Sequence, residues 1–387
     1  LDAFGPLIAP LATELPPSQA DLAPGDADTI RWCVRQANGS GFLFLNNFQD
    51  HVDMIDHHDV RIELDTGRGI VDFPYNGTFT LKKGVSAVLP FHVDLKGLHL
   101  VSATVQPLTK LERGNRSLFV FQALDGLQPE LVLDKQRVAR IELEQGDVIE
   151  EESVWIVKPV PGKEYGMEVL KPDGGTVTIA VFTREEALQT YKLDLWGEER
   201  ILVSNSRLYV KNERLISISE GVHRWQIAIY PSVASGLQAT AGSLQVSRLG
   251  HFELFEVEVP DYRPSIEVHH LSNKHALVKV DPDWPEQVGD VFLQIDYSGD
   301  VAAAYLKGEL LTDHIHYGQV WPIGLKSFRH ELELAPLTLS ITPLRKGTVK
   351  TFVDQALVER FQGREIAAFN RIEAIPHYEV ALYRKFK

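Results

Sequence analysis

The chain has 387 residues, which is long enough for two or three domains. Its 44% hydrophobic and 24% charged residues are ordinary for globular proteins, so each domain can bury a core without disulfide bonds. The formal net charge of −14, with no basic cluster along the sequence, argues against a nucleic-acid partner, because phosphate binding requires positive charge.

The only cysteine, Cys33, excludes an internal disulfide framework and a multi-cysteine zinc site. It lies in the strand-like stretch Arg31–Val34, which predicts a buried, unreactive thiol. No stretch approaches the roughly 18 consecutive apolar residues of a membrane span, and no signal-peptide pattern is present. These features leave the compartment open. Because the chain starts at Leu1 rather than Met, we expect a fragment or a processed product of a longer precursor.

The first 27 residues have the character of a connecting segment. Residues Leu1–Thr13 are mostly apolar, with room for one short helix. Pro16 and Pro17 follow and open a stretch, up to about Asp28, that is rich in Pro, Gly and Asp, as linkers are.

From Thr29 onward the sequence predicts strand after strand. Several stretches alternate apolar with polar residues, which is typical of strands with one buried face. These stretches are Leu89–Leu95, Trp225–Ile229, Phe255–Val259 and Leu337–Ile341. Gly, Asn and Asp mark the turns between strands, as in Asn76-Gly77. The pattern predicts an all-β chain of tandem β-sandwich or jelly-roll domains with one or two short helices.

Two segments carry helix signals. Thr183 followed by Glu186 fits a capping box that opens a short helix to about Lys192. Thr351–Gln362 has helical apolar spacing and ends before Gly363, a suitable C-cap. Neither belongs to a repeated βα pattern, so the chain does not contain a (β/α)₈ barrel.

A composition shift toward Ser, Ala and Gly between Pro231 and Gly242 predicts a domain boundary. We therefore expect a linker over residues 1–27 and a β-sandwich region over residues 28–235. A split of this region near residue 135 stays open. Residues 236–387 would form a further jelly roll.

Three groups of stretches carry a resemblance to a known family. Asn38–Gln49 is an aromatic-rich strand that ends in paired asparagines, and Leu89–Gly97 is followed by Ala103–Thr109. The third group is Gly289–Gly299, Ala304–Leu310 and Trp321–Leu325. Together they resemble the C-terminal, non-catalytic part of family 35 β-galactosidase-type glycoside hydrolases. The third group is similar to the galactose-binding-like jelly roll that closes many such enzymes, and Leu1–Leu11 resembles the segment leaving the catalytic barrel.

The resemblance implies a retaining hydrolase whose two carboxylates sit at the strand ends of a barrel upstream of this chain. No catalytic residue is therefore carried over, and we expect accessory domains that are not catalytic alone. The implied partners are the upstream barrel and a galactosyl glycan, and no cofactor is implied.

Asn212-Glu213 is the only Asn-Glu pair in the sequence, and the acid/base residue of the family follows an asparagine. The pair lies between the strand-like stretches Leu208–Val210 and Leu215–Ile216. A hairpin turn explains this placement better than catalysis does.

Two pairs of histidines raise the question of a metal site. His57 and His58 lie among aspartates, and His314 and His316 alternate beside Asp313. A metal needs three or four converging ligands. We therefore favour a polar loop for the first pair and a solvent-facing edge strand for the second, with no metal at either.

The candidate carbohydrate site consists of Trp321, Tyr317, His316 and His314, which lie close together in the sequence. Sugars bind when their C–H faces lie on aromatic rings and their hydroxyls meet polar groups. The alternative is that Trp321 packs in the core or at a domain interface, since large aromatic side chains mostly serve burial.

Two other functions stay open. The first alternative is a free-standing carbohydrate-binding protein. The second is a structural module with no sugar site, and such a module would expose a large apolar patch. Substrate and linkage are not fixed by the sequence.

Overall fold

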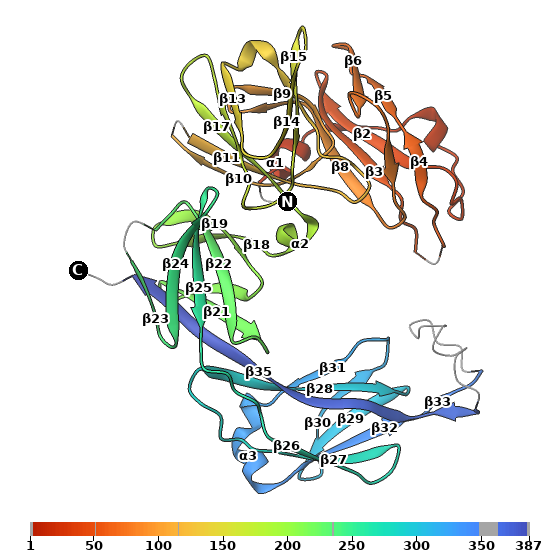
Figure 1. Cartoon of the computed structure of the whole chain (residues 1–387). Coiled ribbons are helices and arrows are strands. Elements are labelled where there is room, and N and C mark those ends of the chain that lie inside the picture. The colour runs from red at the N-terminus through yellow and green to blue at the C-terminus, as the bar shows by residue number, and fades with distance from the viewer. Residues whose placement is uncertain (1–2, 51, 115, 234–235, 348–362, 385–387) are drawn as a thin grey trace. The chain divides into compact units, whose positions relative to one another are not determined.

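The computed structural model describes residues 3–50, 52–114, 116–233, 236–347 and 363–384. Strands dominate this part of the chain (Figure 1), so the all-β prediction is confirmed. The described α-helices have six residues or fewer: α1 (Gly5–Ile8), α2 (Arg184–Leu188) and α3 (Arg329–Leu334). None of them is long and apolar enough to cross a membrane. The helix expected over Thr351–Gln362 lies outside the described residues.

The chain divides into two compact units. Unit 1 comprises residues 1–204, 227–234 and 246–255, and unit 2 comprises residues 205–226, 235–245 and 256–387. The chain therefore passes between the units several times around residues 204–256, which includes the region where the sequence predicts a boundary.

Unit 1 contains a β-sandwich. One sheet has eight strands in the order β1 (Ala12–Glu14), β2 (Arg31–Ala37), β3 (Ser40–Asn46), β8 (Ser86–Leu95), β9 (Leu98–Ala103), β12 (Leu131–Asp134), β15 (Val154–Pro159) and β14 (Gly146–Glu150). The other has five, in the order β10 (Gln106–Arg113), β11 (Arg116–Gln122), β17 (Thr176–Phe182), β16 (Met167–Leu170) and β13 (Arg140–Leu143). Only the β11–β17 pair is parallel in this second sheet.

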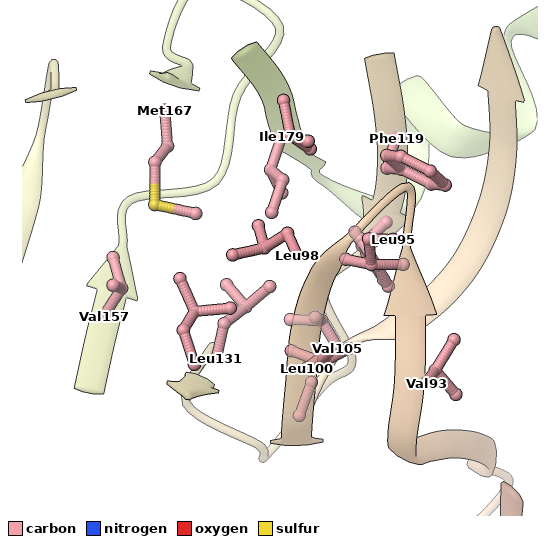
Figure 2. Close-up of a cluster of buried hydrophobic side chains, with 14 of the residues drawn as sticks. Val93, Leu95, Leu98, Leu100, Val105, Phe119, Leu131, Val157, Met167 and Ile179 are labelled. Carbon is pink, nitrogen blue, oxygen red and sulfur yellow. The ribbon is translucent and has the colours of Figure 1, made fainter. Parts of the chain in front are cut away.

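The core of this sandwich lies between the two sheets (Figure 2). Leu98, Leu100 and Leu131 from the eight-stranded sheet meet Phe119 and Ile179 from the five-stranded sheet. All are buried, and each contributes roughly 1.5–3 kcal/mol by leaving water.

The opposite face of the eight-stranded sheet is also covered. Two small two-stranded sheets, β4 (His57–Val60) with β7 (Phe79–Leu81) and β5 (Ile62–Asp65) with β6 (Ile70–Phe73), carry Phe73 and Leu81 onto it. Burial on both faces explains why residues 41–45 are nearly all apolar instead of alternating.

Cys33 lies on β2 and is only partly buried, so the thiol that the sequence placed in a core is half-exposed. It lies directly opposite Phe44 across the sheet, near the edge strand β1. The partial burial raises the pKa of the Cys33 thiol, which keeps it protonated and weakly reactive.

A third, separate sheet follows in the chain. Its order is β18 (Thr190–Leu195), β19 (Glu198–Ser204), β22 (Arg224–Tyr230), β25 (Phe252–Glu258) and β24 (Ser243–Leu249). Ile201, Ala228 and Phe252 from its unit 1 part pack on Leu118 and Phe182.

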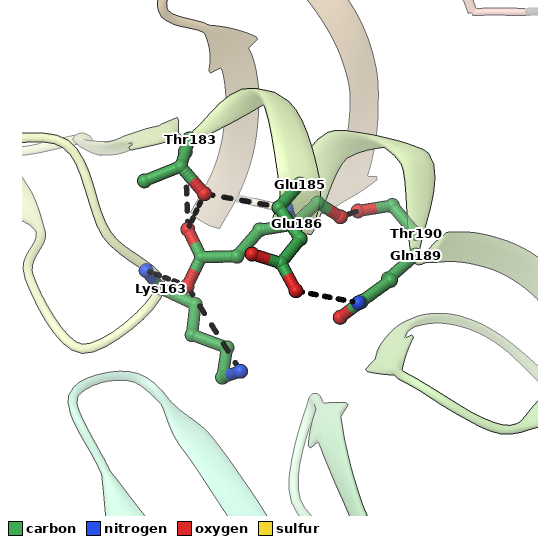
Figure 3. Close-up of polar contacts among 6 residues, drawn as sticks. All are labelled: Lys163, Thr183, Glu185, Glu186, Gln189 and Thr190. Carbon is green, nitrogen blue, oxygen red and sulfur yellow. Dashed lines mark hydrogen bonds and ion pairs between the residues drawn. The ribbon is translucent and has the colours of Figure 1, made fainter.

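Helix α2 connects β17 of the five-stranded sheet of the sandwich to β18 of the third sheet. Figure 3 shows the polar contacts around this helix. Thr183 Oγ1 accepts a hydrogen bond from the Glu186 backbone N–H, and Glu186 Oε2 accepts one from the Thr183 backbone N–H. The capping box predicted from the sequence is therefore confirmed. The helix is shorter than expected: it ends at Leu188 instead of near Lys192, and residues from Thr190 onward form β18.

Unit 2 is a second sandwich. Its first sheet has the order β20 (Arg207–Lys211), β21 (Arg214–Glu220), β35 (Ala368–Arg384), β28 (Val288–Ser298) and β31 (Trp321–Gly324), and β23 (Leu237–Ala239) also pairs with β35. Its second sheet has the order β26 (Ile266–His270), β27 (His275–Val280), β32 (Leu337–Thr342), β29 (Val301–Leu306) and β30 (Glu309–Ile315). A small pair, β33 (Leu344–Arg345) with β34 (Glu365–Ile366), lies outside both.

Tight hairpins connect many strands, and among the residues that the structure describes five hairpins have two-residue turns with positive φ at both positions. This is the type I′ geometry, whose twist matches that of the flanking strands. The turns are Asn38-Gly39, Lys96-Gly97, Trp196-Gly197, Asn212-Glu213 and Lys307-Gly308. The hairpin turn predicted for Asn212-Glu213 is thereby confirmed.

Candidate functional site

The four residues of the predicted carbohydrate site come together in unit 2, around Tyr297 of β28. The His314 ring stacks on Trp321 with 5.9 Å between centroids and lies 5.3 Å from the Tyr317 ring. Tyr297 contacts His316 at 5.0 Å between ring centroids. We call these five residues the aromatic–imidazole cluster.

Most of this cluster is closed to ligands. Trp321 is 3% exposed and His316 is 6% exposed, whereas Tyr317 is 54% exposed. Trp321 and Ile323 of β31 are both buried and Pro322 between them is exposed, so the strand turns its tryptophan inward. The Trp321 ring therefore serves the core, and Tyr317 is the aromatic side chain of the cluster that a sugar can reach.

The surroundings of His314 favour its neutral form. Burial lowers the pKa of His314, and the neighbouring His316 lowers it further. His314 Nδ1 lies 3.0 Å from the Tyr297 hydroxyl, and its Nε2 is buried with no hydrogen-bond partner in the described part of the chain. Because Nδ1 contacts Tyr297 and Nε2 is buried, the His314 ring presents no accessible nitrogen to an external ligand.

Neither histidine pair belongs to a cluster of potential metal ligands in the described part of the chain. Within the described ranges, no three His, Cys, Asp or Glu side chains are placed to hold one ion. His57 and His58 lie on the short strand β4 rather than in a loop, and successive side chains of a strand point to opposite faces. The polar loop expected there is therefore a strand in the structure.

A groove that the sequence did not predict lies elsewhere in unit 2, on one face of the sheet that contains β20, β21, β35 and β28. Its cavity volume is about 790 Å³, which falls in the size range of small-ligand sites. The floor is formed by Ile216 of β21 and by Ala381 and Glu379 of β35.

The strand register brings these floor residues to the same face. Ile216 lies directly opposite Ala381, and Ile218 lies directly opposite Glu379. The edge strand β20 pairs with β21 and places Tyr209 directly opposite Ile216, where Tyr209 is 40% exposed. Because directly opposed residues of an antiparallel pair share a face, the Tyr209 ring flanks the groove.

One wall of the groove is the β20–β21 hairpin with Lys211, Asn212 and Arg214. The type I′ turn at Asn212 fixes this wall. The Arg214 guanidinium lies over the Tyr383 ring, 5.2 Å from its centroid, which joins the hairpin to β35.

The opposite wall is the segment Trp284–Gly289 with Lys326 and Arg329. Arg329 Nε donates a hydrogen bond to the Pro282 carbonyl at 2.6 Å, and its guanidinium lies 4.3 Å from the Trp284 ring centroid. Asp290 Oδ1 accepts hydrogen bonds from the backbone N–H groups of Leu325 and Lys326. These contacts hold the wall in place before any ligand arrives.

The groove presents polar groups of several kinds. Lys211, Arg214 and Lys326 take part in no ion pair with any described residue. Asn212 and Gln287 add amides, and Glu379 adds a carboxylate to the floor. Amides, carboxylates and ammonium groups beside a tyrosine ring suit a ligand rich in hydroxyls.

Sequence reasoning missed the groove because its parts lie far apart in the chain. The pairing of β21, β35 and β28 brings together four distant segments, which are residues 211–216, 284–289, 326–329 and 379–381. The only local sequence feature at the groove is the Asn212-Glu213 pair, and its sequence context predicts a turn rather than a ligand site.

The fold thus defines a protein built of mainly antiparallel β-sandwiches. No model of a known protein family matches the sequence, and no curated protein matches it.

Proposed function

We propose that this chain forms non-catalytic accessory domains of a β-galactosidase-type glycoside hydrolase, and that unit 2 binds a galactosyl glycan in the groove. The observation that carries the proposal is the groove itself, a preformed cavity on a sheet face that is lined by amide, carboxylate and ammonium groups. Tyr209, beside the lining residue Ile216, is the nearby exposed ring.

The resemblance to family 35 supports the same proposal. Gly289–Gly299 and Trp321–Leu325, two of the stretches that carry it, correspond to β28 and β31, which pair directly. The stretch Ala304–Leu310 spans the β29–β30 hairpin of the facing sheet. The resemblance therefore falls on one sandwich, and the groove lies on a sheet of that sandwich.

Calorimetric titration of the whole chain with galactose and lactose tests the proposal. We expect saturable heat in the wild type and a loss of about tenfold or more in affinity for Tyr209→Ala, because one stacking ring is removed. Tyr317→Ala is the matched variant, since it removes an exposed ring of the aromatic–imidazole cluster outside the groove.

Each outcome decides between the candidates. A loss of binding seen only in Tyr317→Ala would place the sugar site at the aromatic–imidazole cluster instead of the groove. Saturable binding without hydrolysis of a nitrophenyl β-galactoside supports a binding module, whether accessory or free-standing. Turnover of the galactoside would overturn the non-catalytic assignment. No heat with either sugar would overturn the groove as a site for galactose or lactose and favour the structural module.

A further inference from the structure

A second cavity lies within unit 1, between the five-stranded sheet and the third sheet, with a volume of about 390 Å³. Its lining includes Arg113, Arg116, Arg248, His251 and Tyr230. We call this cavity the arginine pocket. It shares no residue with the groove of unit 2.

Strand register builds the first wall. Arg113 of β10 lies directly opposite Arg116 of β11, and Arg116 lies directly opposite Thr176 of β17. Two rows away on the same face of the sheet, Leu111 lies opposite Leu118, and both belong to the hydrophobic core between this sheet and the third sheet. The pocket thus begins where the apolar core ends.

The second wall comes from β22 and the β24–β25 hairpin. Tyr230 is half-buried, and its ring packs on Phe252 with 6.0 Å between centroids. Arg248 Nε donates a hydrogen bond to the Gly250 carbonyl at 3.2 Å, which fixes the base of its guanidinium. His251 Nδ1 lies 3.8 Å from Glu168, the only carboxylate in the lining.

The charges of the pocket are unbalanced. Arg113 pairs with Glu198 at 3.0 Å, but Arg116 and Arg248 form no ion pair with any residue that the structure describes. Two like charges directly opposite each other, as in Arg113 and Arg116, destabilise a pair of strands. In a chain with a net charge of −14, such a concentration of arginine favours a ligand of opposite charge.

The neutral groups of the pocket are donors as well. Burial raises the pKa of Tyr230, while Arg116 and Arg113 lower it, so the phenol keeps its proton at neutral pH. Thr176 and Thr178 add hydroxyls to the lining. Guanidinium groups bind carboxylate, phosphate and sulfate through paired N–H donors, and hydroxyls complete the shell around the oxygens.

From this geometry we propose that the arginine pocket binds an oxyanion: a phosphate, sulfate or carboxylate group, free or carried by a larger ligand. The inference does not depend on the proposed function, because it concerns another cavity and another chemistry.

Calorimetric titration with inorganic phosphate, sulfate and acetate at constant ionic strength tests this site in the whole chain. We expect saturable binding of at least one anion, and about tenfold weaker binding in Arg116→Gln and in Arg248→Gln, since each loses a charge-assisted contact. Arg140→Gln is the matched control: it removes one arginine from the same sheet, at β13, outside the pocket, and should bind as the wild type does.

The preference among the anions identifies the source of the charge: phosphate or sulfate for a tetrahedral group, acetate for a carboxylate. Thermal unfolding in anion-free buffer separates a binding role from a structural one. Arg116→Gln should unfold at the wild-type temperature or above, because it removes the repulsion with Arg113. Equal binding by the wild type and the Arg116→Gln/Arg248→Gln double variant, or no saturable binding of any of the three anions, would refute the site.

Discussion

The hydroxyl of Tyr297 donates a hydrogen bond to the backbone carbonyl of His314, with 2.7 Å between the oxygens. His314 Nδ1 lies 3.0 Å from the same hydroxyl. Because the single proton of the phenol goes to the carbonyl, Nδ1 must be the donor to the phenolic oxygen, which assigns the Nδ1–H tautomer to His314. This pair of contacts ties β28 of one sheet of unit 2 to β30 of the other.

Replacing Tyr297 by phenylalanine should therefore lower the free energy of unfolding by about 1–3 kcal/mol, since Tyr297 is 1% exposed and the change leaves buried polar groups without a partner. Urea denaturation measures the change. Tyr317→Phe removes an exposed hydroxyl and is the control, with an expected change below about 0.5 kcal/mol. Equal effects of the two substitutions would contradict the assigned contact.

Trp321→Ala should cost about 3–5 kcal/mol, because it empties a buried site that several rings line. Tyr317→Ala should change the free energy of unfolding by less than about 0.5 kcal/mol. Thermal unfolding of both variants separates a core residue from a surface residue. A Trp321→Ala protein as stable as the wild type would show that the ring is not part of the core.

Acid should destabilise the fold through its buried histidines. Burial is the main cause that lowers the pKa of His92, His99, His314 and His377. An unfolded histidine takes up a proton below about pH 6.5, while these four resist it in the folded state. Their contribution to stability is thus complete above pH 6.5 and is lost as the pH falls below it.

Proton NMR titration of the imidazole signals measures each of these pKa values directly. All four should lie below the ordinary histidine value, and values at or above it would contradict the prediction. The direct measurement matters because burial raises the pKa of Glu130, whose effect on stability across the same range has the opposite sign.

Lys307→Asn should raise the free energy of unfolding by up to about 1 kcal/mol. Lys307 has a φ of 53° at the first position of a type I′ turn and is followed by Gly308, and asparagine is favoured there over lysine. Lys307→Gln removes the same charge without this preference, so it should not stabilise the protein. Chemical denaturation of the two variants distinguishes turn geometry from charge.

Much of the fold could be predicted from local sequence, because a strand with one buried face has an apolar residue at every second position. Leu89 to Leu95 and Leu337 to Ile341 became β8 and β32 with the expected residues buried. The capping box at Thr183 and the turn at Asn212 were equally local signals.

What depends on long-range pairing could not be predicted in this way. Trp321 faces the core because its side of β31 packs against the facing sheet of unit 2. Local sequence alone does not determine which side of a strand packs in this way. The Arg113–Arg116–Thr176 row is hidden for the same reason, since Thr176 joins it through the parallel pairing of β11 with β17.

Strand β35 has a consequence for the order in which unit 2 can assemble. It pairs with β21 through residues near Tyr378–Leu382 and with β28 through residues 368–378, so it fills the middle of its sheet (Figure 1). Until residues 368–384 have left the ribosome, β21 and β28 each expose an unpaired edge. Unit 2 therefore completes this sheet only after β35 has been synthesised, and a nascent chain halted before β35 exposes two strand edges that favour aggregation.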